Sequence, residues 1–357
     1  MANTAPVPNV RPAMNPAVIV AGGGGDGGGA SGGSGGSGGK GIGANTGKGN
    51  QNPEDGSKSG ADCGAGGNGG CTGCSSQIAK GDPVDVATGE VFTIPVTDLS
   101  LRGYFDFELI RSYSSRDRDL DRGLGYGWAH SLDWEIRREG DRLYVTSGEG
   151  HHEEFIAPEL GRSTEEGPWV ITTLDGGYAL RAGNEFVHHF VVDETDREHF
   201  VLSKVTHPSR GELGLFYERG RLTSVVDTVG RTIRFARDRQ GRVISIEVPP
   251  PEGRTRCFAR FRYDEEGNLA ETLDADSRST TYSYDADHRL IQYRYATGLT
   301  FHFRYDREGR CVETWGDYPG GRDPALAANV PEYLADHETH AKGIYHILID
   351  YGPEGYR

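Results

Sequence analysis

The feature that most constrains this chain is a repeat of about twenty residues in its C-terminal half. Segments beginning at Phe216, Phe235, Phe261, Tyr282 and Phe303 align on the turn that follows a β-prone run. The turn glycines are Gly220, Gly241, Gly267 and Gly309, and His288 stands at that position in the fourth segment. The spacing is 21 residues except across a proline-rich insert at 249–253. Such self-similarity predicts stacked supersecondary units that form one continuous sheet.

Each unit reads as an aromatic residue, a spacer, Tyr-Asp, a tight turn and a second strand that starts with an aliphatic residue. The repeated tyrosines should stack on neighbouring units, and each aspartate should bond amides of the turn it opens. Glycine supplies the positive φ that the turn requires. The predicted structural site residues are Tyr263, Asp264, Gly267, Tyr284, Asp285, Tyr305, Asp306 and Gly309.

Short β-prone runs also fill the preceding part of the chain, and turn residues separate them. They lie at Glu90–Val96, Phe105–Tyr113, Leu132–Arg137, Arg142–Ser147, Glu153–Ala157, Trp169–Thr173, Tyr178–Arg181, Phe186–Val192 and Phe200–Thr206. Helical periodicity is evident only at 324–340, where Pro331 would divide it into two short helices. The chain is therefore predicted to be mainly β and antiparallel.

Residues 1–80 differ from the rest in composition. They hold 25 of the 54 glycines and almost no large apolar residues after Val20, so this stretch should be disordered. Four prolines in residues 1–20 favour a short extended peptide that docks on secretion machinery, tethered by the Gly-rich linker. An ordinary disordered tail is the alternative.

Charge and hydropathy exclude several classes of protein. The net charge is −15, which argues against binding to a nucleic-acid backbone. The sequence has no apolar run near the ~20 residues that span a bilayer, and the apolar run at 17–21 is too short for a signal peptide. We expect synthesis in the cytoplasm, with any export through a specialised secretion system.

Three groups of residues could suggest a metal site. Cys63, Cys71 and Cys74 are spaced for zinc but lack an evident fourth ligand, so a reduced thiol cluster is the alternative. Asp117, Asp119 and Asp121 suggest a calcium loop, but its glycine, Gly123, comes one position late, which favours a charged turn.

The histidine pairs His151-His152 and His188-His189 should point to opposite faces of strands and be partly exposed. No nucleophile elbow or phosphate loop occurs. We therefore expect no enzyme activity, no metal and no cofactor.

These units resemble the YD repeats of the Rhs family of polymorphic toxins, because Tyr-Asp-x-x-Gly-x-Leu recurs with a period near 21 residues. Other landmarks resembling that family are Gly81–Phe92, Phe107–Ser115, Gly125–Ile136, Trp315–Pro324 and Ala341–Tyr356. The resemblance implies a β-rich N-terminal domain at 81–210 and YD repeats at 211–357. Composition and periodicity add the docking peptide and linker at 1–80 and a short helical insertion near 324–340.

The resemblance also implies a function, that of a carrier shell enclosing a toxic C-terminal effector. The sequence ends at what looks like the opening of another repeat, so the shell is expected to be incomplete and to lack its effector. Its partners would be the rest of the shell, the toxin cargo and secretion machinery. The alternative is a carbohydrate- or receptor-binding surface built from exposed repeat tyrosines.

Overall fold

The structure of the chain, a computed structural model, describes residues 83–148, 150–182, 185–250, 254–317, 334, 338–352 and 355–356. In these residues the secondary structure is antiparallel strands and one 3₁₀ turn, which confirms the mainly β prediction. The predicted docking peptide, linker and cysteine cluster lie outside the described residues, as does most of the predicted helical insertion. None of the described helical segments is long and apolar enough to cross a membrane.

The first described part contains two small sheets. The hairpin β1–β2 is followed by a three-stranded antiparallel sheet, β3–β4–β5, here called the N-terminal sheet. The bounds are β1 Val84–Asp85, β2 Glu90–Val91, β3 Val96–Leu101, β4 Phe107–Tyr113, the 3₁₀ turn η1 Ser115–Asp117 and β5 Trp128–His130. The predicted single strand at Glu90–Val96 is wrong. Pro95 has no amide hydrogen to donate to a neighbouring strand, so the predicted strand is interrupted between β2 and β3.

The next strands form a sheet that branches at β13. β9 to β13 pair in chain order, and β6–β7–β8 form a second run. β6 pairs with the first residues of β13, and β14 pairs with the last residues on the same edge. The bounds are β6 Glu135–Glu139, β7 Arg142–Thr146, β8 His152–Ile156, β9 Ser163–Glu166, β10 Trp169–Leu174, β11 Gly177–Ala182, β12 Val187–Val192 and β13 His199–His207.

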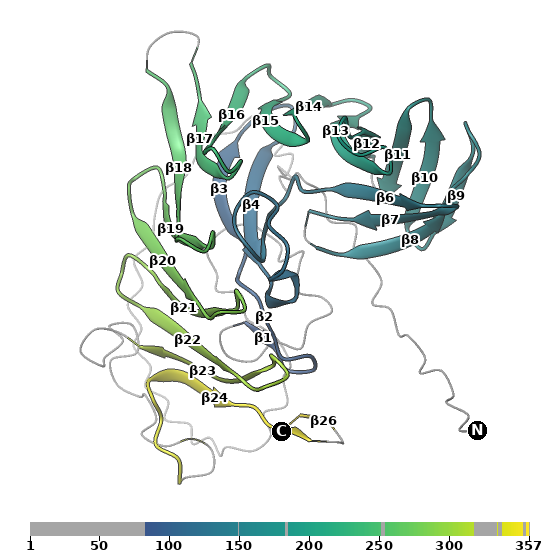
Figure 1. Cartoon of the computed structure of the whole chain (residues 1–357). Helices are drawn as coiled ribbons and strands as arrows, with labels where there is room; N and C mark the ends of the chain where they lie inside the picture. Colours follow the sequence, from purple (N-terminus) through teal and green to yellow (C-terminus); the bar gives the residue numbers. More distant parts are fainter. Residues whose placement is uncertain are drawn as a thin grey trace, which may run out of the picture. The chain divides into compact units, whose positions relative to one another are not determined.

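From β13 onward each strand pairs with the next, as far as β24, and the hairpins succeed one another in Figure 1. The predicted boundary at 210/211 lies in the β13–β14 turn, so the sheet continues across it. The bounds are β14 Gly211–Glu218, β15 Arg221–Val226, β16 Thr232–Arg237, β17 Val243–Val248, β18 Arg256–Tyr263, β19 Leu269–Leu273, β20 Ser279–Tyr284, β21 Leu290–Arg294, β22 Thr300–Tyr305, β23 Cys311–Asp317, β24 Ile344–Leu348, β25 Tyr351–Gly352 and β26 Gly355–Tyr356.

Every repeat hairpin carries a β-bulge at the same place. The register shifts just before the repeat tyrosine, or before Arg237 in the one unit without that tyrosine, so one residue of the second strand has no partner. These residues are Thr223, Ile244, Ala270, Ile291 and Val312. Bulges bend a strand and increase its twist. A bulge in every unit therefore adds curvature at each step along the sheet.

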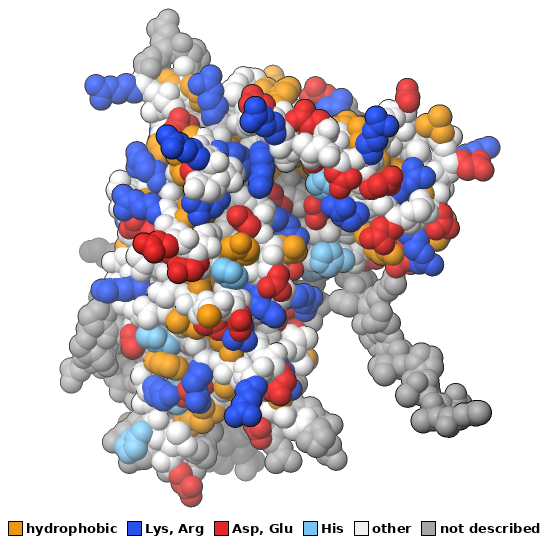
Figure 2. Space-filling model, viewed as in Figure 1, with side chains coloured by type: hydrophobic (Ala, Val, Ile, Leu, Met, Phe, Trp, Pro, Cys, Tyr) orange, Lys and Arg blue, Asp and Glu red, His pale blue; other side chains and the backbone are white. Residues whose placement is uncertain are grey.

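One face of the repeat sheet is apolar and buried. Phe235, Phe261 and Phe303 are each at most 5% exposed, and the N-terminal sheet packs against the same face through Trp128, whose ring lies 5.0 Å from that of Tyr282. The opposite face carries charges of both signs, with ion pairs such as Arg262–Glu271. Figure 2 shows acidic and basic side chains interspersed over the visible face, a pattern that favours solubility.

Candidate functional site

The contact that joins successive repeat units is a hydrogen bond from a tyrosine hydroxyl to a backbone carbonyl. Tyr263, Tyr284 and Tyr305 each end the first strand of a hairpin, whereas Tyr217 is the second-to-last residue of β14 and Tyr351 is the first residue of β25. In all five cases the acceptor lies in an earlier strand. The bonds run from Tyr217 to Leu202 (2.8 Å), Tyr263 to Val243 (2.6 Å), Tyr284 to Leu269 (2.9 Å), Tyr305 to Leu290 (2.8 Å) and Tyr351 to Cys311 (2.9 Å). We call this series the tyrosine ladder. Burial raises the pKa of Tyr263, Tyr284 and Tyr305, which keeps the hydroxyls protonated as donors.

The unit that lacks the tyrosine keeps the contact through an arginine. Arg237 precedes the turn aspartate, as Tyr263, Tyr284 and Tyr305 do in the three units that follow. Its Nε and Nη2 donate to the Leu222 carbonyl at 3.0 and 2.8 Å. The ladder therefore continues through this unit, and the residue that replaces tyrosine is another long donor.

In the four units that begin with β16, β18, β20 and β22, an aspartate follows the ladder residue and accepts hydrogen bonds within its turn. In the last unit Asp306 Oδ1 accepts from the Arg310 amide at 2.9 Å, and Oδ2 accepts from Arg310 Nε at 2.8 Å. Burial tends to raise the pKa of Asp306, but these bonds lower it overall. Asp285 makes the same pair of bonds with Arg289. Asp264 accepts instead from the amide and side chain of Asn268, at 2.7 and 2.9 Å.

The turn arginine also contacts the ladder tyrosine of the following unit. Its guanidinium lies over that ring in three units, which adds a cation–π contact to the hydroxyl bond. The pairs are Arg242 over Tyr263 (4.6 Å), Arg289 over Tyr305 (5.1 Å) and Arg310 over Tyr351 (4.6 Å). The ladder tyrosines thus meet the neighbouring unit through a carbonyl and an arginine. Gly267 and Gly309 lie at the turns with φ of +92° and +81°, where a Cβ would be strained.

Backbone amides next to the bulges donate hydrogen bonds to groups in the N-terminal part of the chain. The amide of Val243 donates to the Gly123 carbonyl at 2.8 Å, and that of Cys311 donates to the Gly89 carbonyl at 2.9 Å. Between them, the Leu290 amide donates to the Tyr113 hydroxyl at 2.9 Å. Residues 83–131 therefore contact several successive units and satisfy groups that would otherwise be buried without partners.

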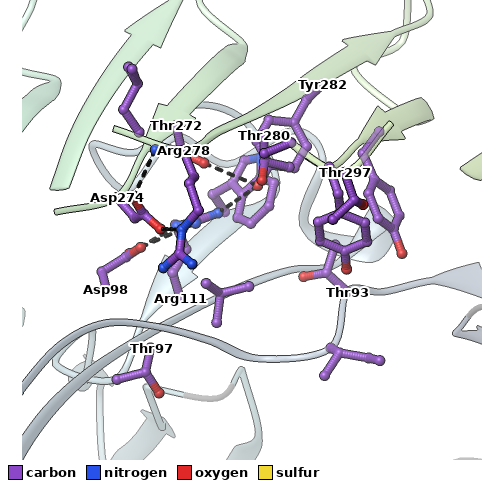
Figure 3. A pocket seen from close by; sticks show the side chains of 17 residues that line it. Thr93, Thr97, Asp98, Arg111, Thr272, Asp274, Arg278, Thr280, Tyr282 and Thr297 are labelled. Atoms are coloured by element: carbon purple, nitrogen blue, oxygen red, sulfur yellow. Dashed lines mark hydrogen bonds and ion pairs between the residues drawn. The ribbon is translucent and has the colours of Figure 1, made fainter. Parts of the chain in front are cut away.

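A cavity of about 330 Å³ lies between the N-terminal sheet and the repeats (Figure 3). Arg111, whose side chain is 2% exposed, lines the cavity and pairs with Asp98 at 2.9 Å. It also donates to the Tyr282 hydroxyl at 3.2 Å. Burial tends to lower the pKa of Arg111, but the Asp98 carboxylate raises it overall, so the guanidinium is charged. Arg111 thus has hydrogen-bond partners in both Asp98 and Tyr282, and it connects the N-terminal sheet to the repeats as a structural contact.

A second cavity, of about 310 Å³, lies where β6 meets β13 and contains titratable groups. His199 contacts Glu135 at 2.9 Å through Nε2 and Asp193 at 3.1 Å through Nδ1. The hydrogen bond to Glu135 raises the pKa of His199 despite the opposing effect of burial. The imidazolium form donates to both carboxylates and so links β6 to the β12–β13 turn.

The other candidate residues are placed in turns or in the core. Asp121 Oδ1 accepts from the amides of Gly123 and Gly125 at 2.7 and 3.0 Å, and Asp117 pairs with Arg122. His188 was expected to be partly exposed, which is wrong. It is 1% exposed and stacks on Trp134 at 4.5 Å. Among the described residues, no group of three or more His, Cys, Asp or Glu side chains is arranged to hold a metal ion.

Two protein families match the parts of the chain that contain the N-terminal sheet and the tyrosine ladder. The RHS Repeat family matches residues 216–255, 263–300 and 284–314, which contain the ladder tyrosines and aspartate turns of β14 to β23. The chain is an Rhs-type YD-repeat protein. A second family, described as a domain of unknown function (DUF6531), matches residues 81–155, which include the N-terminal sheet of this Rhs-type chain.

Relatives with curated descriptions share the Rhs name or a toxin description. "Probable deoxyribonuclease RhsB" of Dickeya dadantii is 34% identical over 279 residues, which cover 75% of this Rhs-type chain and 18% of the relative. "Probable deoxyribonuclease RhsA" of the same organism is 26% identical over 273 residues (74% and 18%). "Double-stranded DNA deaminase toxin A" of Burkholderia cenocepacia is 27% identical over 250 residues (66% and 17%). The chain thus spans less than a fifth of these relatives.

Parts of two solved structures also match part of the Rhs-type chain. The TcdB2–TccC3 crystal structure without its hypervariable C-terminal region matches 53% of this chain and 11% of its own, with 12% identity and a TM-score of 0.28. The Photorhabdus luminescens Tc holotoxin pore matches 54% and 11%, with 14% identity and a TM-score of 0.28.

Sequence reasoning missed three residues that connect the repeat units to one another or to the N-terminal sheet of the Rhs-type chain. Arg237 was aligned in the repeat without a role, although its position before Asp238 signals one. Tyr113 contacts residues about 175 positions away, for which no local pattern exists. Tyr351 completes the ladder beyond the last aligned unit.

Proposed function

We propose that this Rhs-type chain forms part of the wall of a shell that encloses a toxic domain. The single observation that carries the proposal is the tyrosine ladder, because it links each unit to the one before by the same contact. A sheet built in this way grows by adding one similar unit after another. The bulge in every unit bends each step, and a bent sheet can curve around an enclosed space.

The relatives support the toxic cargo. Two are described as deoxyribonucleases and one as a deaminase toxin, and this chain matches less than a fifth of each. We propose that the matched fifth is wall and that these activities belong to other parts of such proteins. Under this proposal residues 81–357 have no catalytic role. Cytoplasmic synthesis and export through a specialised secretion system are part of the same proposal.

The alternative, a surface that binds carbohydrate or a receptor through exposed repeat tyrosines, stays a prediction. Tyr263, Tyr284 and Tyr305 are half-buried, and their hydroxyls are bonded to carbonyls. A glycan that stacked on these rings would have to displace contacts within the wall.

Electron microscopy of the protein expressed from its complete gene tests the proposal. We expect a hollow particle with density inside it, and an effector inside resistant to added protease. The double variant Y284A/Y305A should open the wall and make the effector sensitive to protease. The matched control is Y104A, because Tyr104 is 71% exposed and lies outside the ladder. A solid particle, or equal protease sensitivity in the two variants, would refute the proposal.

A further inference from the structure

Two neighbouring turns of the repeat depart from the pattern, and their unusual residues contact each other. Asn268 stands where the other Asp-x-x-x-Arg turns have arginine, and His288 stands where most have glycine. His288 Nδ1 lies 2.7 Å from Asn268 Oδ1. Asn268 also donates from Nδ2 to Asp264 at 2.9 Å, so this turn keeps the bond to its aspartate. The two unusual residues, Asn268 and His288, are therefore directly connected to each other.

His288 occupies a backbone conformation that disfavours it. Its φ is +59°, in the left-handed region, where a side chain bearing Cβ is strained and glycine is not. Strain of this kind persists where surrounding contacts hold the residue in place. Here the imidazole stacks on the ring of Tyr126, with centroids 3.9 Å apart and planes 20° from parallel. Tyr126 belongs to the segment that leads into β5 of the N-terminal sheet.

Because Asn268 replaces the turn arginine, no guanidinium from this turn lies over the ring of the next ladder tyrosine, Tyr284. A turn arginine covers the ring of Tyr263, Tyr305 or Tyr351 in the regular units. At Tyr284 the turn residue is the shorter Asn268. The Tyr284 hydroxyl accepts instead from Trp128 Nε1 at 2.8 Å, and its ring lies 6.2 Å from that of Tyr113. The missing guanidinium leaves Tyr284 available to the N-terminal sheet.

The backbone of the N-terminal part follows these two turns closely. A Cβ on Gly125, where φ is +88°, would lie 2.8 Å from the Leu269 amide nitrogen and 3.0 Å from the Gly267 carbonyl oxygen. The Tyr113 hydroxyl donates to the His288 carbonyl at 3.1 Å and accepts from the Leu290 amide at 2.9 Å. Glycine allows the close approach at one turn, and tyrosine bridges both backbone groups at the other.

We propose that Asn268 and His288 form a recognition site for the glycine–aromatic segment Gly123–Trp128 and so specify the repeat unit on which the N-terminal sheet docks. A regular unit, with arginine over its tyrosine and glycine in its turn, offers neither the open ring nor the stacking partner. This proposal goes beyond the wall function and does not depend on a toxic cargo. Its experiment uses the present chain alone, so its outcome is separate from that of the shell test.

The chain contains a matched control for the experiment. Ser277 is a second residue with side chain at positive φ, +64°, at the equivalent position of the exposed turn 274–278. Glycine at either site relieves the same backbone strain, but only H288G removes contacts to Tyr126 and Asn268. We expect H288G to raise the hydrogen-exchange rate of the Leu290 amide at least tenfold. S277G should leave that rate unchanged or lower it.

Two further variants keep the test decisive if H288G folds poorly. Y126A removes the stack without altering a repeat turn, and N268R restores the regular arginine. Each should raise exchange at Leu290 about tenfold while leaving the Val225 amide, in β15 and remote from the site, at its wild-type rate. The proposal is overturned if H288G and S277G behave alike. It is overturned equally if Y126A and N268R both leave Leu290 as protected as in the wild type.

Discussion

Replacing Tyr305 by phenylalanine should remove one contact of the tyrosine ladder and little else. The ring keeps its place beneath Arg289, but the Leu290 carbonyl loses the hydroxyl that donates to it at 2.8 Å. Leu290 is 0% exposed, so water cannot readily replace that donor. A buried carbonyl left without a partner costs about 1–3 kcal/mol. We therefore expect Y305F to lower the free energy of unfolding by about 2 kcal/mol, which is about 30-fold in the opening equilibrium.

Urea unfolding followed by tryptophan fluorescence measures the loss, and hydrogen exchange across β21 and β22 shows where it occurs. The control is Y104F, because Tyr104 is 71% exposed and its hydroxyl lies outside the ladder. Surface changes of this kind alter stability by at most about 0.5 kcal/mol. If Y305F and Y104F had the same midpoint and the same exchange in β21, the ladder would not join the units as described.

Three further predictions concern single residues. R237Y should unfold at a higher urea concentration than R237A, because a tyrosine hydroxyl can replace the bond to Leu222; equal midpoints would refute this. D306A should cost about 1–2 kcal/mol in urea unfolding, as loss of a capping side chain does, whereas E266A on an exposed turn residue should be neutral. The raised pKa of His199 stabilises the fold fully below the unfolded-state value of about 6.5, and the benefit is lost as pH rises through the folded value. The stability difference between wild type and H199Q should therefore shrink from pH 6 to pH 9, and a constant difference would contradict it.

The repeat register could be predicted from the sequence because its determinants are local. Asp306 and Arg310 are four residues apart, and the glycine between them meets a conformational requirement of the same turn. Turn chemistry of this kind is independent of the rest of the fold. The positions of most strands could likewise be predicted from the alternation of apolar and polar residues, because one face of the sheet is buried.

The docking of the N-terminal sheet could not be predicted because it depends on contacts far apart in the chain. Arg111 meets Tyr282 across 171 residues, and no spacing rule links the two positions. The branch at β13 is of the same kind, because one strand edge serves two partners. A local signal did exist at His288, where a large residue replaces the turn glycine, but its meaning depends on Tyr126.

The most direct test of the account measures the distance between equivalent positions of non-adjacent units. Arg234 in β16 and Thr281 in β20 are exposed, and three strands lie between theirs in the sheet. Strands in a sheet lie about 4.8 Å apart, so β16 and β20 should be about 19 Å apart across the sheet. Arg234 lies about three residues along the strand from the position across from Thr281, so the two backbones should be about 22 Å apart. Spin labels attached there through non-cysteine chemistry should give one narrow distance distribution near that value. A broad distribution, or a mean beyond about twice that spacing, would show that the units do not stack into one sheet.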